Sequence, residues 1–263
     1  MDHPGLLPVP NPVAWEDFLG IDGLDIYWYA IMLTGGIVCG TMLAYMRAPK
    51  KGLDPERVLD LVLYCVPVSV VGARAYYVIF SWKDYAGDLM KMLNIRGGGL
   101  AIHGALIGGL GMGIYLLRKW KDAPSAWLDL VMPSLALGQA IGRWGNYFNS
   151  EAHGGPTDLP WAIWADGHLV HPTFLYESIW CLLLCLFLLR IDTRPGFTYK
   201  QTSLYLMLYG VERFFVEGLR TDSLMIGSFR QAQLISAAGI LIGAVLYIRG
   251  KRAASGETQE ETR

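Results

Sequence analysis

The sequence predicts an all-α integral membrane protein with seven transmembrane helices, and three observations support this fold class. Hydrophobic residues make up 53% of the 263 residues and charged residues only 17%, with a mean hydropathy of +0.32. The 31 glycines are typical of membrane helices, whose backbones approach one another closely. Seven segments come close to the ~20 mostly apolar residues that a membrane span needs. They are residues 26–46, 58–80, 98–117, 125–142, 171–189, 202–219 and 230–249.

The basic residues predict the orientation of these helices. Residues 1–46 contain five acids and no lysine or arginine, whereas the connections after the first, third, fifth and seventh helices hold 14 of the 22 basic residues. Connections rich in lysine and arginine stay on the cytoplasmic side. We therefore expect the N-terminus outside, the C-terminus in the cytoplasm, and a multi-pass protein of the cell membrane.

The connections indicate few separate parts. Residues 1–25 carry four prolines before Val13 and are expected to form an external arm. Residues 26–249 form one seven-helix transmembrane domain, in which 143–170 is the longest external connection and is expected to be a small head between the fourth and fifth helices. Residues 250–263 are predicted to be a cytoplasmic polar tail, disordered from 253 onward.

Composition and spacing also exclude several kinds of function. The net charge of −1 predicts no nucleic-acid surface. The four cysteines lie inside apolar segments without a CxxC pair, so we expect neither a disulfide framework nor a cysteine-based zinc site. His153, His168 and His171 lack a recognised zinc spacing, and a GxSxG motif is absent, so a metal site and a hydrolase are both disfavoured.

Polar residues within membrane spans mark candidate functional sites, because each charged group costs ~2.5–3.5 kcal/mol to insert. The predicted orientation places nearly all of them in the outer half of the membrane and leaves the inner half almost bare of charge. They are Tyr29, Arg74, His103, Arg143, Asn146, Asn149, Glu151, His171, Glu177, Glu212, Arg213, Glu217 and Arg220. This asymmetry favours a cavity that opens to the outer leaflet and acts on lipid head groups.

The arginines indicate the charge of the ligand. A guanidinium group binds phosphate through a planar, bidentate fork, which makes an anionic phospholipid the expected ligand. Two arginines in one cavity would repel each other unless an anion or a carboxylate lay between them.

Structural explanations stay open for individual residues. Arg213, Glu217 and Arg220 lie at i, i+4 and i+7, so Glu217 can orient both arginines for a ligand, or the three can form a structural ion-pair ladder. For Arg74 we favour an ion pair that packs helices together. His103, in a glycine-rich apolar helix, is either a hydrogen-bonded core residue or a proton acceptor.

The stretch GRWGNYFNSEAHGG at 142–155 resembles the signature of the bacterial phosphatidylglycerol–prolipoprotein diacylglyceryl transferases. That signature is similar to G-R-x-G-N-[FY]-x-N-x-E-x-x-G, and residues 142–154 match it throughout. Further blocks resemble the family in the same order and extend over nearly the whole chain. They are WYAIM at 28–32, GARAYYV at 72–78, GGLAIHGALIGG at 98–109, HPTFLYES at 171–178 and YGVERFFVEGLR at 209–220.

The resemblance implies a membrane transferase without metal or organic cofactor. Such an enzyme moves the diacylglyceryl group of phosphatidylglycerol to the lipobox cysteine of a preprolipoprotein signal peptide. A thioether forms and glycerol phosphate leaves, which is the first step of bacterial lipoprotein maturation. The resemblance also implies the bacterial inner or plasma membrane, with the seven-helix domain as the catalytic domain.

The family motifs also assign roles to residues. By position, Arg143 and Arg213 are expected to bind phosphate, and His103 is expected to take the thiol proton; these three form the predicted catalytic set. Other matched positions are expected to contribute to substrate binding: Tyr29, Asn146, Glu151, Gly154, Glu217 and Arg220.

Three positions depart from the family pattern. Gly97 stands where many members have glutamate or glutamine, Phe174 where many have glutamine, and Ala30 where glycine is usual. We expect Gly97 and Phe174 to change the lining of the site entrance.

Two other classes of function compete with the transferase. A small-solute transporter needs access from both faces and polar groups near the midplane, and the bare cytoplasmic half argues against it. A non-catalytic lipid-binding scaffold would tolerate the loss of His103 and the arginines.

Overall fold

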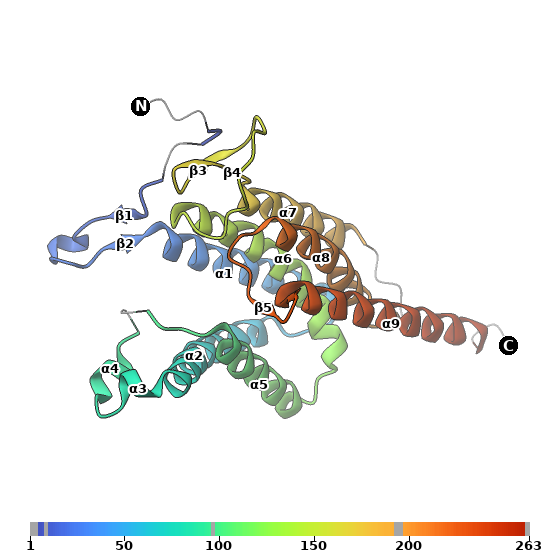
Figure 1. Ribbon diagram of the computed structural model, residues 1–263. Coiled ribbons are helices and arrows are strands. Elements are labelled where there is room, and N and C mark those ends of the chain that lie inside the picture. Colours follow the sequence, from blue (N-terminus) through green and yellow to red (C-terminus); the bar gives the residue numbers. More distant parts are fainter. Residues whose placement is uncertain (1–4, 8–9, 96–97, 192–196, 261–263) are drawn as a thin grey trace. The chain divides into compact units, whose positions relative to one another are not determined.

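The computed structural model describes residues 5–7, 10–95, 98–191 and 197–260, and these residues are mostly helical (Figure 1). They form two compact units. The first comprises Met1–Ala44 with Ser125–Arg263, and the second is Tyr45–Pro124.

The first unit contains most of the long helices. They are α1 (Trp28–Arg47, whose last turn enters the second unit), α6 (Pro124–Phe148), α7 (Thr173–Arg190), α8 (Lys200–Leu219) and α9 (Gln231–Glu260). Helix α8 packs along α9 and against α7. A buried cluster joins side chains of α6, α7 and α8: Met132, Ala136, Leu184, Cys185, Leu188 and Tyr205. This cluster packs α7 against the two helices that carry Arg143 and Arg213.

Glycine allows a close helix contact in the first unit. A Cβ atom on Gly36 of α1 would lie 2.8 Å from the carbonyl oxygen of Gly138 in α6. Small residues bring membrane helices together in this way because hydrophobic burial does not favour one apolar neighbour over another in lipid.

Short antiparallel strand pairs lie beside the helices of the first unit. They are β1 (Val13–Trp15) with β2 (Ile26–Tyr27), β3 (Ile163–Ala165) with β4 (His168–Val170), and β5 (Met225–Ile226) with β6 (Phe229–Arg230). A 3₁₀ helix, Phe18–Gly20, lies between β1 and β2. The β3–β4 hairpin forms the centre of the predicted head.

The second unit is a helical hairpin. Helix α2 (Pro55–Phe80) packs along α5 (Ile102–Trp120), with the short helices α3 (Trp82–Tyr85) and α4 (Leu89–Leu93) between them in the sequence. A 3₁₀ helix, Pro49–Lys51, precedes α2. Arg57 in the first turns of α2 pairs with Asp122 just beyond the end of α5, at 2.7 Å.

Each of the seven predicted segments overlaps one long helix. Among the described helices, four are long and apolar enough to cross a membrane: Trp28–Arg47, Pro55–Phe80, Thr173–Arg190 and the Gln231–Ser255 part of α9. The other three, α5, α6 and α8, carry His103, Arg143 and Arg213.

Two predicted helix ends differ from the structure. Helix α6 continues to Phe148, so Arg143 and Asn146 lie on a helix within the segment expected to be a head. Helix α9 continues to Glu260, so the prediction of a disordered tail is wrong for residues 253–260. Alanine, glutamate and glutamine in that segment are strong helix formers, which a composition argument for disorder overlooks.

A buried carboxylate ties the start of α8 to α6. The Oδ1 atom of Asp129 accepts hydrogen bonds from the amide and the hydroxyl of Thr202, at 2.8 and 2.7 Å. The first amides of a helix have no partner inside the helix, so Asp129 caps α8 from a neighbouring helix and fixes where α8 begins.

Candidate active site

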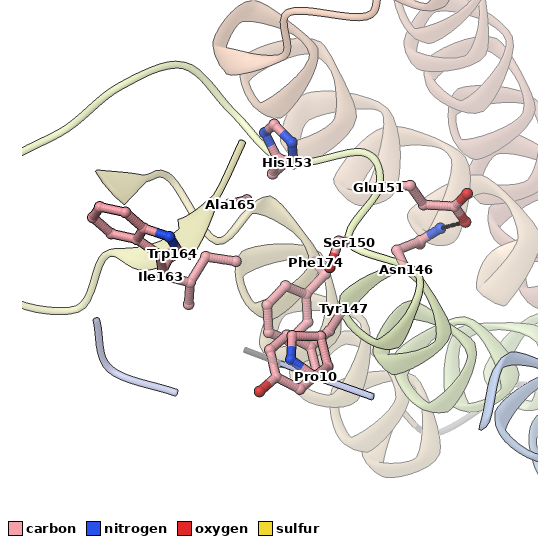
Figure 2. A pocket seen from close by; sticks show the side chains of 10 residues that line it. All are labelled: Pro10, Asn146, Tyr147, Ser150, Glu151, His153, Ile163, Trp164, Ala165 and Phe174. Carbon is pink, nitrogen blue, oxygen red and sulfur yellow. Dashed lines mark hydrogen bonds between the residues drawn. The ribbon is translucent and has the colours of Figure 1, made fainter. Parts of the chain in front are cut away.

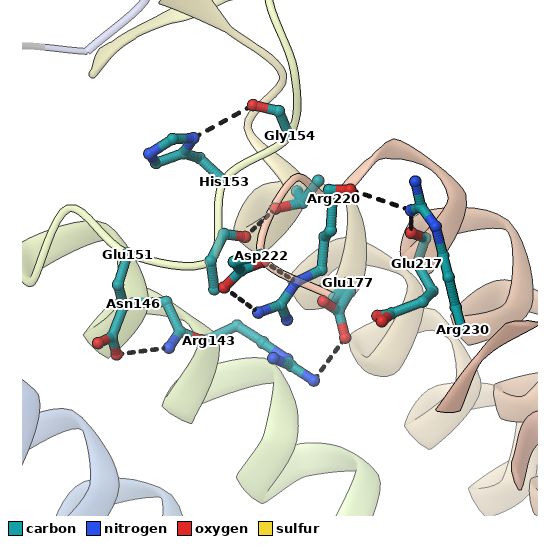
Figure 3. A network of polar contacts seen from close by, with 12 residues as sticks. Arg143, Asn146, Glu151, His153, Gly154, Glu177, Glu217, Arg220, Asp222 and Arg230 are labelled. Atoms are coloured by element: carbon teal, nitrogen blue, oxygen red, sulfur yellow. Dashed lines mark hydrogen bonds and ion pairs between the residues drawn. The ribbon is translucent and has the colours of Figure 1, made fainter. Parts of the chain in front are cut away.

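Two arginines from different helices meet at one buried carboxylate, Glu177. The Nη2 atom of Arg143 lies 2.5 Å from Oε2 of Glu177 (Figure 3). The Nη1 atom of Arg213 lies 3.2 Å from Oε1 of the same carboxylate. Glu177 is only 1% exposed. Arg213 also pairs with Glu217, one turn further along α8, at 2.7 Å.

Helix direction explains why these side chains meet. Arg143 lies near the end of α6, Glu177 near the start of α7 and Arg213 in the last two turns of α8. Because α6 and α7 run in opposite directions after a connection, the end of one lies beside the start of the other. The three helices therefore deliver their polar groups to one end of the bundle.

The negative charge of Glu177 compensates the repulsion between the two arginines. Both guanidinium groups are largely buried, with side-chain exposures of 20% for Arg143 and 16% for Arg213. Taking charges out of water costs several kcal/mol per ion unless opposite charges and hydrogen bonds compensate. Glu177 provides that compensation, and it is a residue that the predicted site did not include. Its signal in the sequence was its place in HPTFLYES and the need for an anion between two arginines.

A second carboxylate in this cluster has no hydrogen-bond partner. Glu212, the residue before Arg213, is 6% exposed, and both of its carboxylate oxygens are buried without a partner in the described part of the chain. Buried ionisable groups of membrane proteins usually belong to functional sites. Glu212 is one of the polar residues of the sixth predicted helix, and its position in the sequence indicates no role.

Glu217 does not hold both arginines as predicted. Arg220 instead forms a bidentate pair with Asp222, with Nε–Oδ1 and Nη2–Oδ2 distances of 2.9 and 2.8 Å. Helix α8 ends at Leu219, so Arg220 has left the helical face that i, i+7 spacing assumes. The hydrogen bonds from Arg220 hold the pKa of Asp222 below its usual value.

Arg230 of β6 fixes the backbone at the end of α8. Its Nη1 atom donates to the carbonyl oxygens of Glu217 and Arg220, and Figure 3 shows it beside these residues. The last carbonyl groups of a helix lack intrahelical donors, so a cation there is well placed.

Gly154 lies where no side chain fits. It forms an antiparallel bridge with Arg220, and its amide donates to the carbonyl of His171 at 2.9 Å. A Cβ atom added to Gly154 would lie 2.7 Å from Cβ of His171 and 3.1 Å from the carbonyl oxygen of Leu219. Close backbone approach explains the glycine.

Asn146 and Glu151 bond to each other beside a small pocket. The Asn146 amide donates to Oε1 of Glu151 at 2.9 Å. Figure 2 shows the pocket, which is lined among others by Asn146, Glu151, His153 and Phe174 and has a volume of about 10 Å³. That is room for about one water molecule, so this pocket is not the predicted lipid cavity.

Tyr29 and Phe174 pack against aromatic and glycine neighbours. A Cβ atom on Gly145 of α6 would lie 2.9 Å from the Tyr29 ring, so Tyr29 lies against the same helix as Arg143. Phe174 is 3% exposed and stacks on Tyr147 with ring centroids 5.0 Å apart, which places it in the core below the head. Gly97 lies outside the described residues.

His103 and Arg74 belong to the second unit. His103 lies in the first turn of α5, is exposed, and stacks on Tyr76 at 5.8 Å. The ion pair predicted for Arg74 is wrong: no described carboxylate pairs with it, and its guanidinium donates to four backbone carbonyls instead.

The histidines considered as metal ligands have other partners. His153 pairs with Asp166 at 3.1 Å, His168 contacts the carbonyl of Asp166, and His171 contacts the hydroxyl of Tyr176. Among the described residues, no group of three or more His, Cys, Asp or Glu side chains is arranged to hold a metal ion.

Comparison with known proteins identifies the family. The family model of prolipoprotein diacylglyceryl transferase matches residues 16–249. The chain belongs to this family. It is therefore a multi-pass membrane protein and a transferase of lipoprotein biosynthesis.

Individual relatives agree over most of their length. The chain is 48% identical to the phosphatidylglycerol–prolipoprotein diacylglyceryl transferase of Finegoldia magna over 88% of this chain and 94% of that protein. It is 45% identical to the enzyme of the same name from Clostridioides difficile over 86% of this chain and 91% of that protein. For the one from Gloeobacter violaceus the identity is 44%, with coverages of 94% and 96%.

Proposed function

We propose that this chain transfers the diacylglyceryl group of phosphatidylglycerol to the lipobox cysteine of a preprolipoprotein. The observation that carries the assignment of the site is the convergence of Arg143 and Arg213 on Glu177 in a largely buried cluster. Arginine forks bind phosphate in the same bidentate manner as they bind a carboxylate. A phosphate group of the lipid can therefore take over guanidinium donors that now pair with Glu177.

The reaction is a substitution at the glyceryl carbon. The cysteine thiolate attacks that carbon, the new C–S bond forms, and the bond between the carbon and the phosphate oxygen breaks. The electron pair of the broken bond goes to the phosphate oxygen, and glycerol phosphate leaves. Arg143 and Arg213 stabilise the charge that develops on the departing phosphate. Such electrostatic stabilisation of the transition state is usually the largest single contribution to catalysis.

His103 is the proposed acceptor of the thiol proton. Its exposed ring at the start of α5 is open to a substrate group, and a neutral imidazole can accept a proton near pH 7. Glu217 orients Arg213, and Asn146, Glu151, Gly154, Arg220 and Tyr29 complete the proposed substrate site.

The proposed topology has seven spans, with the N-terminus outside and the C-terminus in the cytoplasm. The bilayer is then a partner of all seven long helices, and the site acts on lipid of the outer leaflet of the bacterial cell membrane. Single cysteines placed in the 10–25 arm and in the 250–255 segment test this in intact cells. An impermeant maleimide should label only the arm, and labelling of both or of neither would reject the orientation.

One assay tests the activity directly. Purified protein is mixed with phosphatidylglycerol and a lipobox peptide, and the release of glycerol phosphate is followed together with the mass of the peptide. Transfer adds the diacylglyceryl group to the peptide thiol, and a peptide with serine in place of cysteine is the matched control. No release from folded protein would reject the proposed function in favour of a lipid-binding scaffold.

A further inference from the structure

Arg74 bonds to two backbone segments that precede His103 in the sequence. It lies on α2 and is 7% exposed. Its Nη2 and Nε atoms donate to the carbonyls of Lys91 and Met92 at 2.7 and 2.9 Å. Its Nη1 atom donates to the carbonyls of Gly98 and Gly99, also at 2.7 and 2.9 Å.

These four contacts join two backbone segments through one side chain. Lys91 and Met92 lie at the end of α4, where carbonyls can accept from donors outside the helix. The carbonyl of Lys91 also accepts from the amide of Asn94, at 3.3 Å. Gly98 and Gly99 come shortly before α5, and both have positive φ, 81° and 74°. Four of the five guanidinium donors are used, so Arg74 has no free fork for a phosphate.

The start of α5 is fixed to the same part of α2. The amide of Ala101 donates to the carbonyl of Ala73 at 3.1 Å. A Cβ atom on Gly104 would lie 2.2 Å from the carbonyl oxygen of Gly72, so the two helices touch backbone to backbone there. His103 lies between Ala101 and Gly104 and stacks on Tyr76, two residues after Arg74.

We propose that Arg74 is a positioning residue that sets the place of His103 in the reaction. By fixing the backbone at Gly98 and Gly99, it fixes the entry into α5 and the stacking of the imidazole on Tyr76. This inference rests on the proposed function only in taking His103 as the thiol base. We call the four hydrogen bonds of Arg74 to the backbone the clamp. A misplacement of a catalytic group by about 1 Å lowers the rate on the order of 100-fold, so the clamp has a direct effect on turnover.

The test compares Arg74→Lys with the wild-type protein in detergent with phosphatidylglycerol. Lysine keeps the charge but offers one compact ammonium group, which cannot bond to both backbone segments. We expect ethoxyformylation of His103 by diethyl pyrocarbonate, followed by mass spectrometry, to become about threefold faster or more as the clamp opens. We also expect kcat to fall about tenfold or more, with KM for phosphatidylglycerol unchanged.

Two controls separate this effect from general loosening. Arg57→Lys changes another arginine of α2, which pairs with Asp122, and should leave the His103 rate unchanged. His168, exposed on the β3–β4 hairpin, should react equally fast in every variant.

A second variant, at Gly99, disrupts the same contact with Arg74 from the backbone side. A Cβ atom on Gly99 would lie 2.6 Å from Nη1 of Arg74 and 2.7 Å from the ring of Tyr77, so Gly99→Ala should reproduce the faster labelling. Gly87→Ala introduces similar backbone strain, at φ 89°, with no atom within 4 Å, and should not. Equal His103 labelling in wild type, Arg74→Lys and Gly99→Ala would overturn the inference. Because labelling needs no turnover, failure of the transferase assay alone would count against the proposed function and not against the clamp.

Discussion

Arg143 and Glu177 form an ion pair of 2.5 Å in which the carboxylate is almost completely buried. The same carboxylate lies 3.2 Å from Arg213. Glu177 thus occupies the position between two cations that the proposed phosphate needs. Ligand binding and ion pairing compete for the same donors, and this competition decides the outcome of several substitutions.

Arg143→Ala should reduce turnover by about 100-fold or more, because the departing phosphate loses one of its two guanidinium groups. Stability should change modestly, since Glu177 keeps Arg213 as a partner. Glycerol phosphate release and the Tm in detergent measure the two effects. A collapse of Tm with no stable protein in the membrane would instead assign Arg143 a structural role.

Glu177→Gln should lower the Tm of the lipid-free protein and increase the stabilisation that phosphatidylglycerol provides. Without the carboxylate the two guanidinium groups repel each other, and an anionic head group restores the missing charge. Thermal unfolding with and without the lipid measures the difference. Glu56→Gln, at an exposed position of α2, is the control. The same lipid-induced shift in wild type and Glu177→Gln would contradict a phosphate site at this carboxylate.

Gly154→Ala should destabilise the protein by about 1–3 kcal/mol and lower its activity, because the new methyl group collides with His171 and the backbone of Leu219. Gly155→Ala is a matched control. Its Cβ would lie 3.8 Å from Thr221 and 4.0 Å from Leu219, which are ordinary contacts. If the two neighbouring alanine variants had the same Tm and turnover, close packing would not explain Gly154.

His103→Gln should reduce kcat by about 100-fold or more while phosphatidylglycerol still raises the Tm as in wild type, because only the proton acceptor is lost. Single-turnover kinetics with the lipobox peptide separates chemistry from binding. Near-normal turnover would mean that another group or water takes the thiol proton.

Asp222→Asn should make the Tm depend less on pH at acidic pH. The pKa of Asp222 is lowered in the folded protein by hydrogen bonds from Arg220, so its ionised form stabilises the fold above the unfolded pKa of about 3.9. That contribution is lost as the pH falls through the folded pKa. Between about pH 5 and about pH 3 the Tm of wild type should therefore fall more steeply than that of Asp222→Asn. Parallel curves would show that the pair does not contribute.

Much of the fold and part of the site could be predicted from the chain alone. Apolar segments long enough to span a bilayer predicted the positions of the seven long helices in the described part of the chain, because helix formation in lipid depends on local composition and length. The family motifs predicted the enzyme class. The repulsion between two arginines predicted that an anion, such as a carboxylate, lies between them. Helix ends were less predictable: α6 and α9 both continue past the apolar residues that define a span.

The partners of the charged side chains depended on tertiary structure. Helical spacing linked Glu217 to Arg220, but α8 ends at Leu219 and turns Arg220 toward Asp222. A helix-packing ion pair was expected for Arg74, but its guanidinium group donates to backbone carbonyls of a later segment, among them those of Lys91 and Gly98. Composition and periodicity act within one segment, and these contacts join segments that only folding brings together. The sequence by itself determined which residues are available for the chemistry, whereas the tertiary structure decided which of them form ion pairs. The physical reason is that an ion pair needs its two groups within a few ångströms, and that distance depends on where each helix ends.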